Sequence, residues 1–184
     1  MNRGNASARH RVTAYARPQS RVSAVSDEER IVQILLSKQW HIAFAESCTG
    51  GMAVSRIVSV PNASRVLDVS FVTYAPEAKT RYLGVSPETI ASYDVVSEPV
   101  AAEMAKGVAE RADAQVGVSI TGYAGPGGTD RIPAGTVCFG FFIHGTVTTR
   151  TAAFGDLGRN VVRRCAVDFA LHHLAGLLEE LSAE

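Results

Sequence analysis

The chain has 184 residues, 46% of them hydrophobic, and its 18 basic and 18 acidic residues leave a formal net charge of zero. This composition suits one domain of ordinary size and provides no overall attraction to nucleic acid or to an anionic membrane. The three cysteines form no CxxC pair and no apolar run reaches the ~18 residues that span a membrane, so we expect no metal site, no disulfide framework and a cytoplasmic location.

The first 25 residues differ from the rest, because they carry five arginines and no acidic residue. The segment lacks the continuous apolar core of a secretory signal. An arginine-rich segment without acidic residues could instead be an organelle transit peptide. Its mixed polar composition favours a disordered basic tail over residues 1–25. We expect a single domain over residues 26–184.

The domain begins with a capping-box pattern, in which Ser26 is followed three residues later by Glu29. Apolar residues then recur at helical spacing and predict a helix over residues 27–38. The apolar run 40–45 predicts a buried strand, and residues 49–58 again have helical spacing.

A β-branched and aromatic run predicts a second strand over residues 69–74. Residues 76–83 fit a short helix closed by Gly84. Ser86-Pro87 and Ser97-Glu98-Pro99 each place proline in the first turn of a helix, where its missing N–H has no cost. The helix that begins at Ser97-Glu98-Pro99 is the longer of these two, and its inner face is predicted to bury Val100, Ala101, Met104, Ala105 and Val108.

A third strand is predicted at residues 116–120, followed by a glycine-rich loop over 121–133. Two further strands, 136–143 and 146–154, flank a tight turn at His144-Gly145. A final helix covers residues 159–181. This order predicts an α/β fold with three layers, α/β/α, in which a central mixed sheet has helices on both faces.

Polar residues and glycines follow three of the predicted strands, in the segments AESCTGG (45–51), TYAPEAK (73–79) and TGYAGPGG (121–128). In open α/β sheets, ligands bind beyond the carboxyl ends of the strands. We therefore expect these three segments to converge on one site.

AESCTGG could hold a nucleophile at Ser47, Cys48 or Thr49. Backbone N–H groups at such a turn can stabilise an oxyanion, and Gly50 and Gly51 permit close approach of a ligand. The same segment would also fit a plain helix cap, with Ser47 or Thr49 as the capping residue. The heptapeptide alone does not decide between these interpretations.

A serine nucleophile needs a base. None of the five histidines is well placed by the predicted elements, whereas Lys79 follows the second strand at the same sheet edge as Ser47. A lysine acts as a base only when neutral, so burial would have to lower its pKa from ~10.4 toward 7–8. A solvated helix lysine paired with Glu77 or Asp94 is the alternative.

Taken together, the segments resemble the CinA C-terminal domain family, whose stand-alone members are nicotinamide-nucleotide amidases. The resemblance covers roughly residues 27–182 in the family's order. The matching segments are AESCTGG (45–51), FVTYAPEAK (71–79), YLGV (82–85), VVSEPVA (95–101), SITGYAGPGG (119–128), PAGTV (133–137), FGD (154–156) and VVRR (161–164).

The resemblance implies a serine amidohydrolase with a Ser/Lys pair. Ser47 would be the nucleophile, Lys79 the base and Tyr74 a proton relay, while Cys48 would be a buried neighbour. The substrate would be nicotinamide mononucleotide, hydrolysed to nicotinic acid mononucleotide and ammonia without a metal or organic cofactor. The oxyanion and substrate contacts would come from Thr49, Gly50, Gly51, Thr121, Gly122 and Gly125, with Arg159 and Arg163 as candidates for the phosphate.

Two alternatives stay open. One is a non-catalytic nucleotide-binding or regulatory module that keeps the fold, since some relatives are linked to competence and DNA damage; the other is an amidase for a different small amide. Neither nucleic acid nor membrane is expected as a partner, and self-association of relatives implies a homo-oligomer.

Overall fold

The computed structural model describes residues 25–183, so the tail prediction for residues 1–25 lies, except for Val25, outside the described residues. The chain order is α1 (Asp27–Lys38), β1 (Ile42–Glu46), α2 (Met52–Val58), η1 (Ala63–Arg65), β2 (Phe71–Val72), α3 (Pro76–Ala78), η2 (Lys79–Leu83), α4 (Pro87–Tyr93), α5 (Glu98–Ala112), β3 (Val116–Gly122), β4 (Thr136–Ile143), β5 (Thr146–Ala153) and α6 (Arg159–Ala183).

The five strands form one mixed sheet in the order β2-β1-β3-β4-β5. β1 runs parallel to both β2 and β3, whereas β4 is antiparallel to β3 and β5. The carboxyl ends of β1, β2 and β3 therefore lie at the same edge of the sheet, as the three polar segments require.

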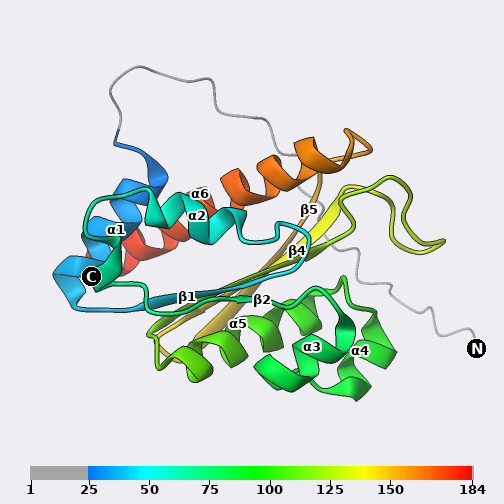
Figure 1. Ribbon diagram of the computed structural model, residues 1–184, viewed down its shortest axis with the longest axis horizontal. Coiled ribbons are helices and arrows are strands. Elements are labelled where there is room, and N and C mark those ends of the chain that lie inside the picture. The colour runs from blue at the N-terminus through cyan, green and yellow to red at the C-terminus, as the bar shows by residue number, and fades with distance from the viewer. Residues whose placement is uncertain (1–24, 184) are drawn as a thin grey trace, which may run out of the picture.

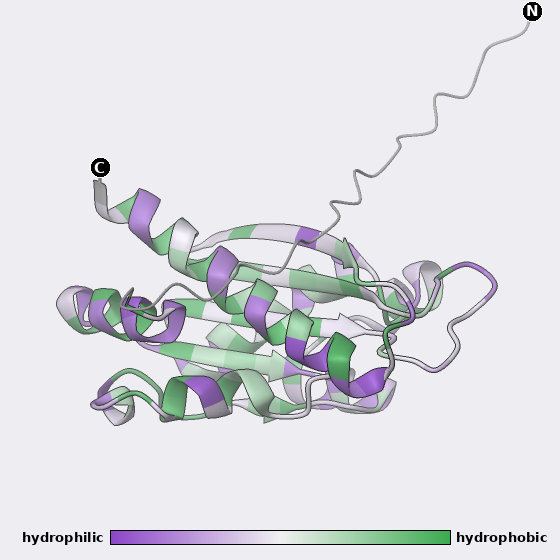
Figure 2. Ribbon diagram, turned by 90° about the horizontal axis from the view of Figure 1, so that it is seen from above, coloured by the Kyte–Doolittle hydropathy of each residue, from purple (hydrophilic) through white to green (hydrophobic). Residues whose placement is uncertain are grey.

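Helices cover both faces of the sheet, which confirms the predicted three-layer α/β/α fold. In Figure 1, α1, α2 and α6 lie above the sheet and α3, α4 and α5 lie below it. The larger apolar core fills the space between the sheet and the upper helices, and a smaller one lies between the sheet and α5. In Figure 2 the inner strands are mostly green to white, and the covering helices carry both purple and green.

Several predicted elements are confirmed closely. The capping box forms as predicted, with Ser26 and Glu29 bonding each other's backbone N–H groups, and α1 spans the predicted residues. The five residues predicted on the inner face of α5 are all buried. His144 and Gly145 both have positive φ, 50° and 96°, as in the type I′ turn that suits a two-residue hairpin.

The strands flanking the site differ from the prediction. β2 has only two residues instead of six, because the Ser70 hydroxyl accepts the Phe44 N–H at 2.9 Å where a strand would offer a backbone carbonyl. β3 continues two residues beyond Ile120, so Thr121 belongs to the strand and not to the loop. The predicted helix over 76–83 is a turn of α-helix followed by a turn of π-helix that begins at Lys79.

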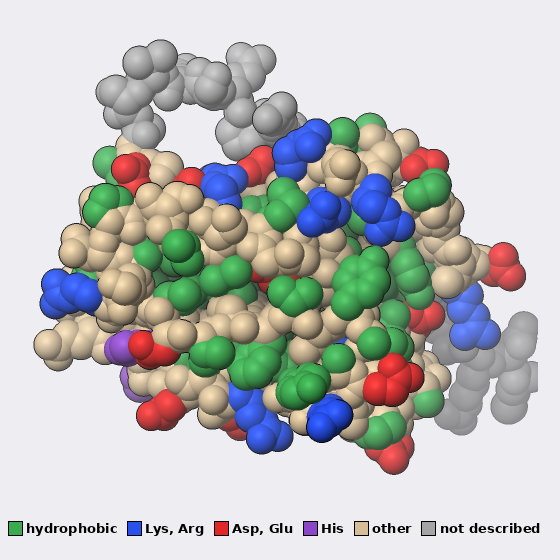
Figure 3. All heavy atoms as spheres, in the orientation of Figure 1, with side chains coloured by type: hydrophobic (Ala, Val, Ile, Leu, Met, Phe, Trp, Pro, Cys, Tyr) green, Lys and Arg blue, Asp and Glu red, His purple; other side chains and the backbone are tan. Residues whose placement is uncertain are grey.

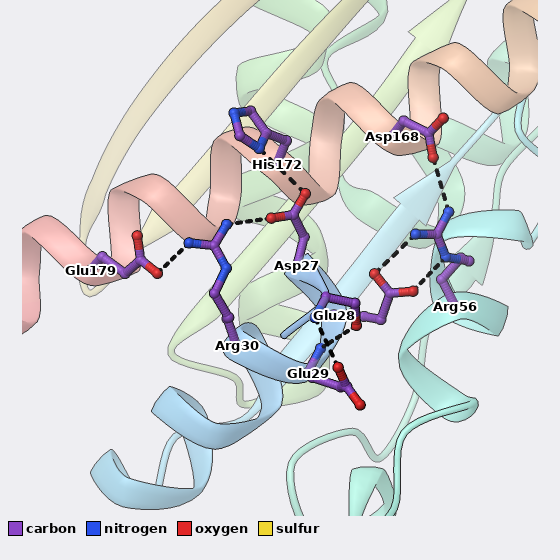
Figure 4. A network of polar contacts seen from close by, with 9 residues as sticks. Asp27, Glu28, Glu29, Arg30, Arg56, Asp168, His172 and Glu179 are labelled. Carbon is purple, nitrogen blue, oxygen red and sulfur yellow. Dashed lines mark hydrogen bonds and ion pairs between the residues drawn. The ribbon is translucent and has the colours of Figure 1, made fainter. Parts of the chain in front are cut away.

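Ion pairs connect the three upper helices (Figure 4). Arg56 of α2 bonds Glu28 of α1 at 2.8 and 2.9 Å and Asp168 of α6 at 2.9 Å, while Arg30 of α1 bonds Glu179 of α6. On the face drawn in Figure 3, acidic and basic side chains are both spread over the surface. Within residues 25–183, none of the helices combines the length and apolar character needed to cross a bilayer.

Candidate active site

A pocket of about 180 Å³ lies at the carboxyl ends of β1 and β3. Its walls come from the turn after β1, from Tyr74 and Lys79 after β2, from Val95-Val96 before α5, from residues 121–127 and from Arg159. All three polar segments singled out in the sequence therefore meet in one pocket, as predicted.

Ser47 and Lys79 are in direct contact in this pocket. The Lys79 Nζ lies 3.1 Å from the Ser47 Oγ and donates a second hydrogen bond, of 2.6 Å, to the Thr73 carbonyl oxygen. Side chains alternate along β1, so Ser47 faces the α5 side of the sheet, where the π-helical turn presents Lys79. π-helical turns are frequently found at functional sites.

Lys79 is only 1% exposed, although lysine is almost never fully buried without a charged partner. No acidic side chain is among the residues that line the pocket. Burial disfavours the ammonium form and lowers the pKa of Lys79 to about 8. The lysine can therefore be neutral near physiological pH, as a general base must be.

The structure distinguishes the three candidate nucleophiles. Cys48 is 6% exposed and packs in the upper core, and burial raises the pKa of its thiol to about 12, so it carries no thiolate at neutral pH. Thr49 is fully buried and its hydroxyl has no hydrogen-bond partner among the described residues. Ser47 is the hydroxyl in contact with Lys79.

The predicted oxyanion role of the Gly50 and Gly51 amides requires correction. The Gly50 N–H donates to the Ser47 carbonyl at 3.2 Å, and the Gly51 N–H donates to the Glu46 carboxylate at 2.9 Å. Both amides therefore have acceptors within the protein itself. The two glycines are needed for their positive φ, 61° and 93°, which L-residues rarely adopt.

Glu46 was not identified from the sequence. It is 1% exposed, and its carboxylate accepts the N–H groups of Gly51, Ala53 and Val54 at 2.9, 3.2 and 2.9 Å. It caps the first turn of α2 in the role that the sequence suggested for Ser47 or Thr49. An acidic residue at the end of a fully apolar strand was the available signal, because a buried carboxylate must find donors.

Tyr74 and Arg159 lie at the rim of the pocket. Tyr74 is 64% exposed, and its hydroxyl lies 3.5 Å from the Arg159 Nη1. Within the described residues, the Tyr74 hydroxyl makes no hydrogen bond to Ser47 or Lys79, so the arrangement provides no contact for the predicted proton relay. Arg159 begins α6 and presents a cation at the entrance of the pocket.

Arg163 contacts the protein backbone. Its Nε and Nη2 donate to the carbonyl oxygens of Cys48 and Thr49, both at 2.9 Å, and its Nη1 donates to the Asn160 side chain at 3.2 Å. It does not line the pocket. Of the two arginines considered for phosphate, only Arg159 is therefore at the pocket.

The three residues predicted from the glycine-rich segment all line the pocket. Thr121 donates its hydroxyl to the Val95 carbonyl at 2.8 Å and so fixes one wall. A Cβ at Gly122 would come within 2.7 Å of Val137, so only glycine fits there. Gly125 has a φ of +90°, which again favours glycine.

The fold and the pocket define an α/β protein with a buried Ser/Lys pair at the carboxyl edge of a mixed sheet. The model of the CinA C-terminal domain family matches residues 25–178, and the chain belongs to that family.

Curated relatives agree with this assignment. The chain is 45% identical over 166 residues to a CinA-like protein of Chlorobaculum tepidum, a match that covers 86% of this chain and 38% of that protein. It is also 45% identical over 148 residues to protein YdeJ of Escherichia coli, covering 79% of this chain and 85% of YdeJ. The chain thus spans well under half the length of several relatives and most of the length of others.

Solved structures show the same fold. A CinA superfamily protein from Escherichia coli has a TM-score of 0.79 at 38% identity, over 86% of this chain and 94% of that one. A competence/damage-inducible protein from Agrobacterium tumefaciens has a TM-score of 0.79 at 34% identity, over 86% and 99% of the two chains.

Proposed function

We propose that this protein is a nicotinamide-nucleotide amidohydrolase that converts nicotinamide mononucleotide and water into nicotinic acid mononucleotide and ammonia. The observation that supports this most strongly is the contact between the Ser47 Oγ and a buried lysine whose pKa is lowered to about 8. A structural lysine would gain nothing from such burial, whereas a serine nucleophile requires a neutral base beside it.

The reaction follows from these two residues. Neutral Lys79 takes the hydroxyl proton as the Ser47 Oγ forms a bond to the carboxamide carbon. The C–N bond then breaks, and Lys79 returns the proton to the leaving nitrogen, which departs as ammonia. Lys79 then takes a proton from water, whose oxygen attacks the acyl carbon. The bond from that carbon to the Ser47 Oγ breaks, and Lys79 returns the proton to the Oγ, which releases the acid and regenerates Ser47 and neutral Lys79.

The size of the pocket is consistent with a small amide. Its volume of about 180 Å³ is below the ~300–1,000 Å³ usual for sites that enclose a whole drug-sized ligand. The ring with its carboxamide would enter the pocket, and the ribose phosphate would remain near the entrance. There Arg159 supplies a cation and Tyr74 an aromatic face.

An ammonia-release assay on nicotinamide mononucleotide tests the proposal, with wild type, Ser47→Ala and Lys79→Ala compared. We expect turnover by wild type alone. Mononucleotide binding without ammonia release would support a non-catalytic nucleotide-binding module, and turnover of another small amide in preference would change the substrate while leaving the Ser/Lys chemistry in place. Full activity of Ser47→Ala would overturn the mechanism.

A further inference from the structure

The backbone around Cys48 is held from both sides. The Ser47 carbonyl, which precedes the Cys48 N–H, accepts the Gly50 N–H at 3.2 Å, and the Cys48 carbonyl accepts the Arg163 Nε at 2.9 Å. Because a peptide unit is planar, fixing a carbonyl also fixes the direction of the N–H that follows it. The bond to the Ser47 carbonyl therefore sets the direction of the Cys48 N–H, and the bond to the Cys48 carbonyl fixes the next peptide, which carries the Thr49 N–H.

Arg163 controls both of these peptide units. It contacts the Cys48 carbonyl directly, and its Nη2 holds the carbonyl of Thr49 at 2.9 Å. That second carbonyl shares a peptide plane with the Gly50 N–H, the group that bonds the Ser47 carbonyl. One guanidinium thus fixes the peptides on either side of Cys48 through a short series of hydrogen bonds.

Within residues 25–183, the Cys48 and Thr49 N–H groups donate to no other residue, whereas the Gly50 and Gly51 amides both have acceptors. The Cys48 N–H contacts the sulfur of its own side chain, a weak acceptor that a developing oxyanion can replace. Of the two residues, Cys48 lines the pocket beside Ser47 and Thr49 does not. In strand-to-helix nucleophile turns, the amide that follows the nucleophile is placed to receive the oxyanion.

We infer that Arg163 is a positioning residue that orients the Cys48 N–H as an oxyanion donor, and that it does not bind the substrate phosphate. This inference rests on the proposed acyl chemistry at Ser47, but it does not depend on which amide is the substrate. Arg163 acts in the transition state through the backbone, so its removal should lower kcat and leave KM nearly unchanged.

The first test compares wild type, Arg163→Gln and Arg163→Lys on nicotinamide mononucleotide and on the same nucleoside without its phosphate. We expect Arg163→Gln to lower kcat about 100-fold on both substrates, the size of effect seen when one oxyanion donor is lost. Arg163→Lys, which keeps one donor, should recover part of the loss. A rise in KM on the mononucleotide alone, with kcat kept, would show phosphate binding and overturn the inference.

Two further variants guard against a general loss of folding. Arg164→Gln removes an exposed neighbouring cation of the same helix and should behave as wild type. Asn160→Ala removes an exposed support of the Arg163 Nη1 and should lower kcat in the same direction by less. The thermal unfolding temperature of each variant shows whether a decrease in kcat follows from a loss of stability.

The second test uses an uncharged aryl fluorophosphonate, which reacts with activated serines, with labelling of Ser47 followed by intact mass. We expect Arg163→Gln to be labelled about 100-fold more slowly than wild type. If wild type is labelled but releases no ammonia from the mononucleotide, the proposed substrate is wrong and this inference stands. Equal labelling rates in the two proteins would overturn the inference, whatever the substrate is.

Discussion

The two faces of the sheet surround a cationic side chain in different ways. On the face covered by α1, α2 and α6, Arg56 is held between Glu28 and Asp168, and these carboxylates raise its pKa. On the face covered by α3, α4 and α5, the hydrogen bonds of the Lys79 amine within the described residues go to a hydroxyl and a carbonyl oxygen, and burial lowers its pKa to about 8. Paired carboxylates keep a cation ionised, whereas burial without an ionic partner favours the neutral amine, an arrangement that clusters at functional sites.

The contrast is sharpest between two neighbouring residues, the last residue of β1 and the one that follows it. Glu46 and Ser47 point to opposite faces, and both are polar groups less than 10% exposed. Glu46 accepts three backbone N–H groups and completes α2, while the hydroxyl of Ser47 contacts the amine that would deprotonate it. Substitutions on the two faces should therefore have separable effects on stability and on activity.

The largest expected effect is on the catalytic face. Ser47→Ala should lower kcat by roughly 10⁴-fold or more, since removal of a nucleophile abolishes the covalent route. Its unfolding temperature should stay close to that of wild type, because the side chain is small and makes one side-chain hydrogen bond among the described residues. Ammonia release gives kcat, and calorimetry gives the unfolding temperature. A large decrease in both would contradict the separation of activity and stability between the two faces.

Lys79→Met should lower kcat about 1,000-fold because the base is lost. It should also raise the free energy of unfolding at pH 7, because an apolar chain of similar length replaces a desolvated ammonium.

In wild type, kcat/KM should rise with pH and level off above about pH 8, which is the pKa of Lys79 in the folded protein. Initial rates in buffers of constant ionic strength between pH 6 and 9 test this.

The sign of the stability effect follows from the same pKa. Between about pH 8 and 10.5 the unfolded chain binds a proton at Lys79 that the folded protein lacks, so the free energy of unfolding should rise with pH in that window. The rise is at most roughly 1.4 kcal/mol per pH unit. Lys79→Met should lack this contribution, and equal slopes in the two proteins would contradict the lowered pKa.

On the opposite side of β1, Glu46→Ala should lower the free energy of unfolding by roughly 2–3 kcal/mol, because three backbone N–H groups lose a charged acceptor. Glu46→Gln keeps an acceptor oxygen and should lose less. Urea denaturation gives these values. Any loss of activity should follow from disorder of the turn between β1 and α2, and should therefore accompany a loss of stability. A Glu46→Gln variant that is as stable as wild type but inactive would show that Glu46 takes part in the reaction itself.

The smallest effect is expected at the ion pairs. Glu28→Gln should cost about 0.5–1 kcal/mol, since Arg56 is partly exposed and keeps its hydrogen bond to Asp168. Ammonia release at saturating substrate should equal that of wild type. The loss should shrink in 1 M salt, where charge interactions are screened within about 3 Å.

Elements with strong local signals were predictable. The capping box fixed the start of α1, and β4 has the predicted bounds because aromatic and β-branched residues run between a glycine and a two-residue turn. The convergence of Ser47 and Lys79 also followed, because parallel strands end at one edge of a sheet. These features depend on residues close in sequence or on a general rule of topology.

What could not be predicted depends on contacts between distant residues. The attachment of Arg163 to the turn 115 residues earlier is one such contact, and the replacement of a ladder bond by the Ser70 hydroxyl is another. Sequence patterns also give no sign that the Ser47 carbonyl occupies the Gly50 amide, and the position of Glu46 at the end of an apolar strand indicates only that its carboxylate must find donors, not which ones. The sequence therefore predicted which residues form the site, but not which hydrogen-bond partners its amides and arginines have.

The alternation of Glu46 and Ser47 also places a demand on folding. A slip of β1 by one residue would turn Glu46 toward Lys79 and Ser47 toward α2. The resulting carboxylate–ammonium pair would hold the lysine protonated and leave the nucleophile without its base. All five residues of β1 are buried, and it pairs with strands on both sides, so a misaligned chain would also lose its apolar packing. Correct alignment of one short strand is thus what keeps an inhibitory ion pair from forming.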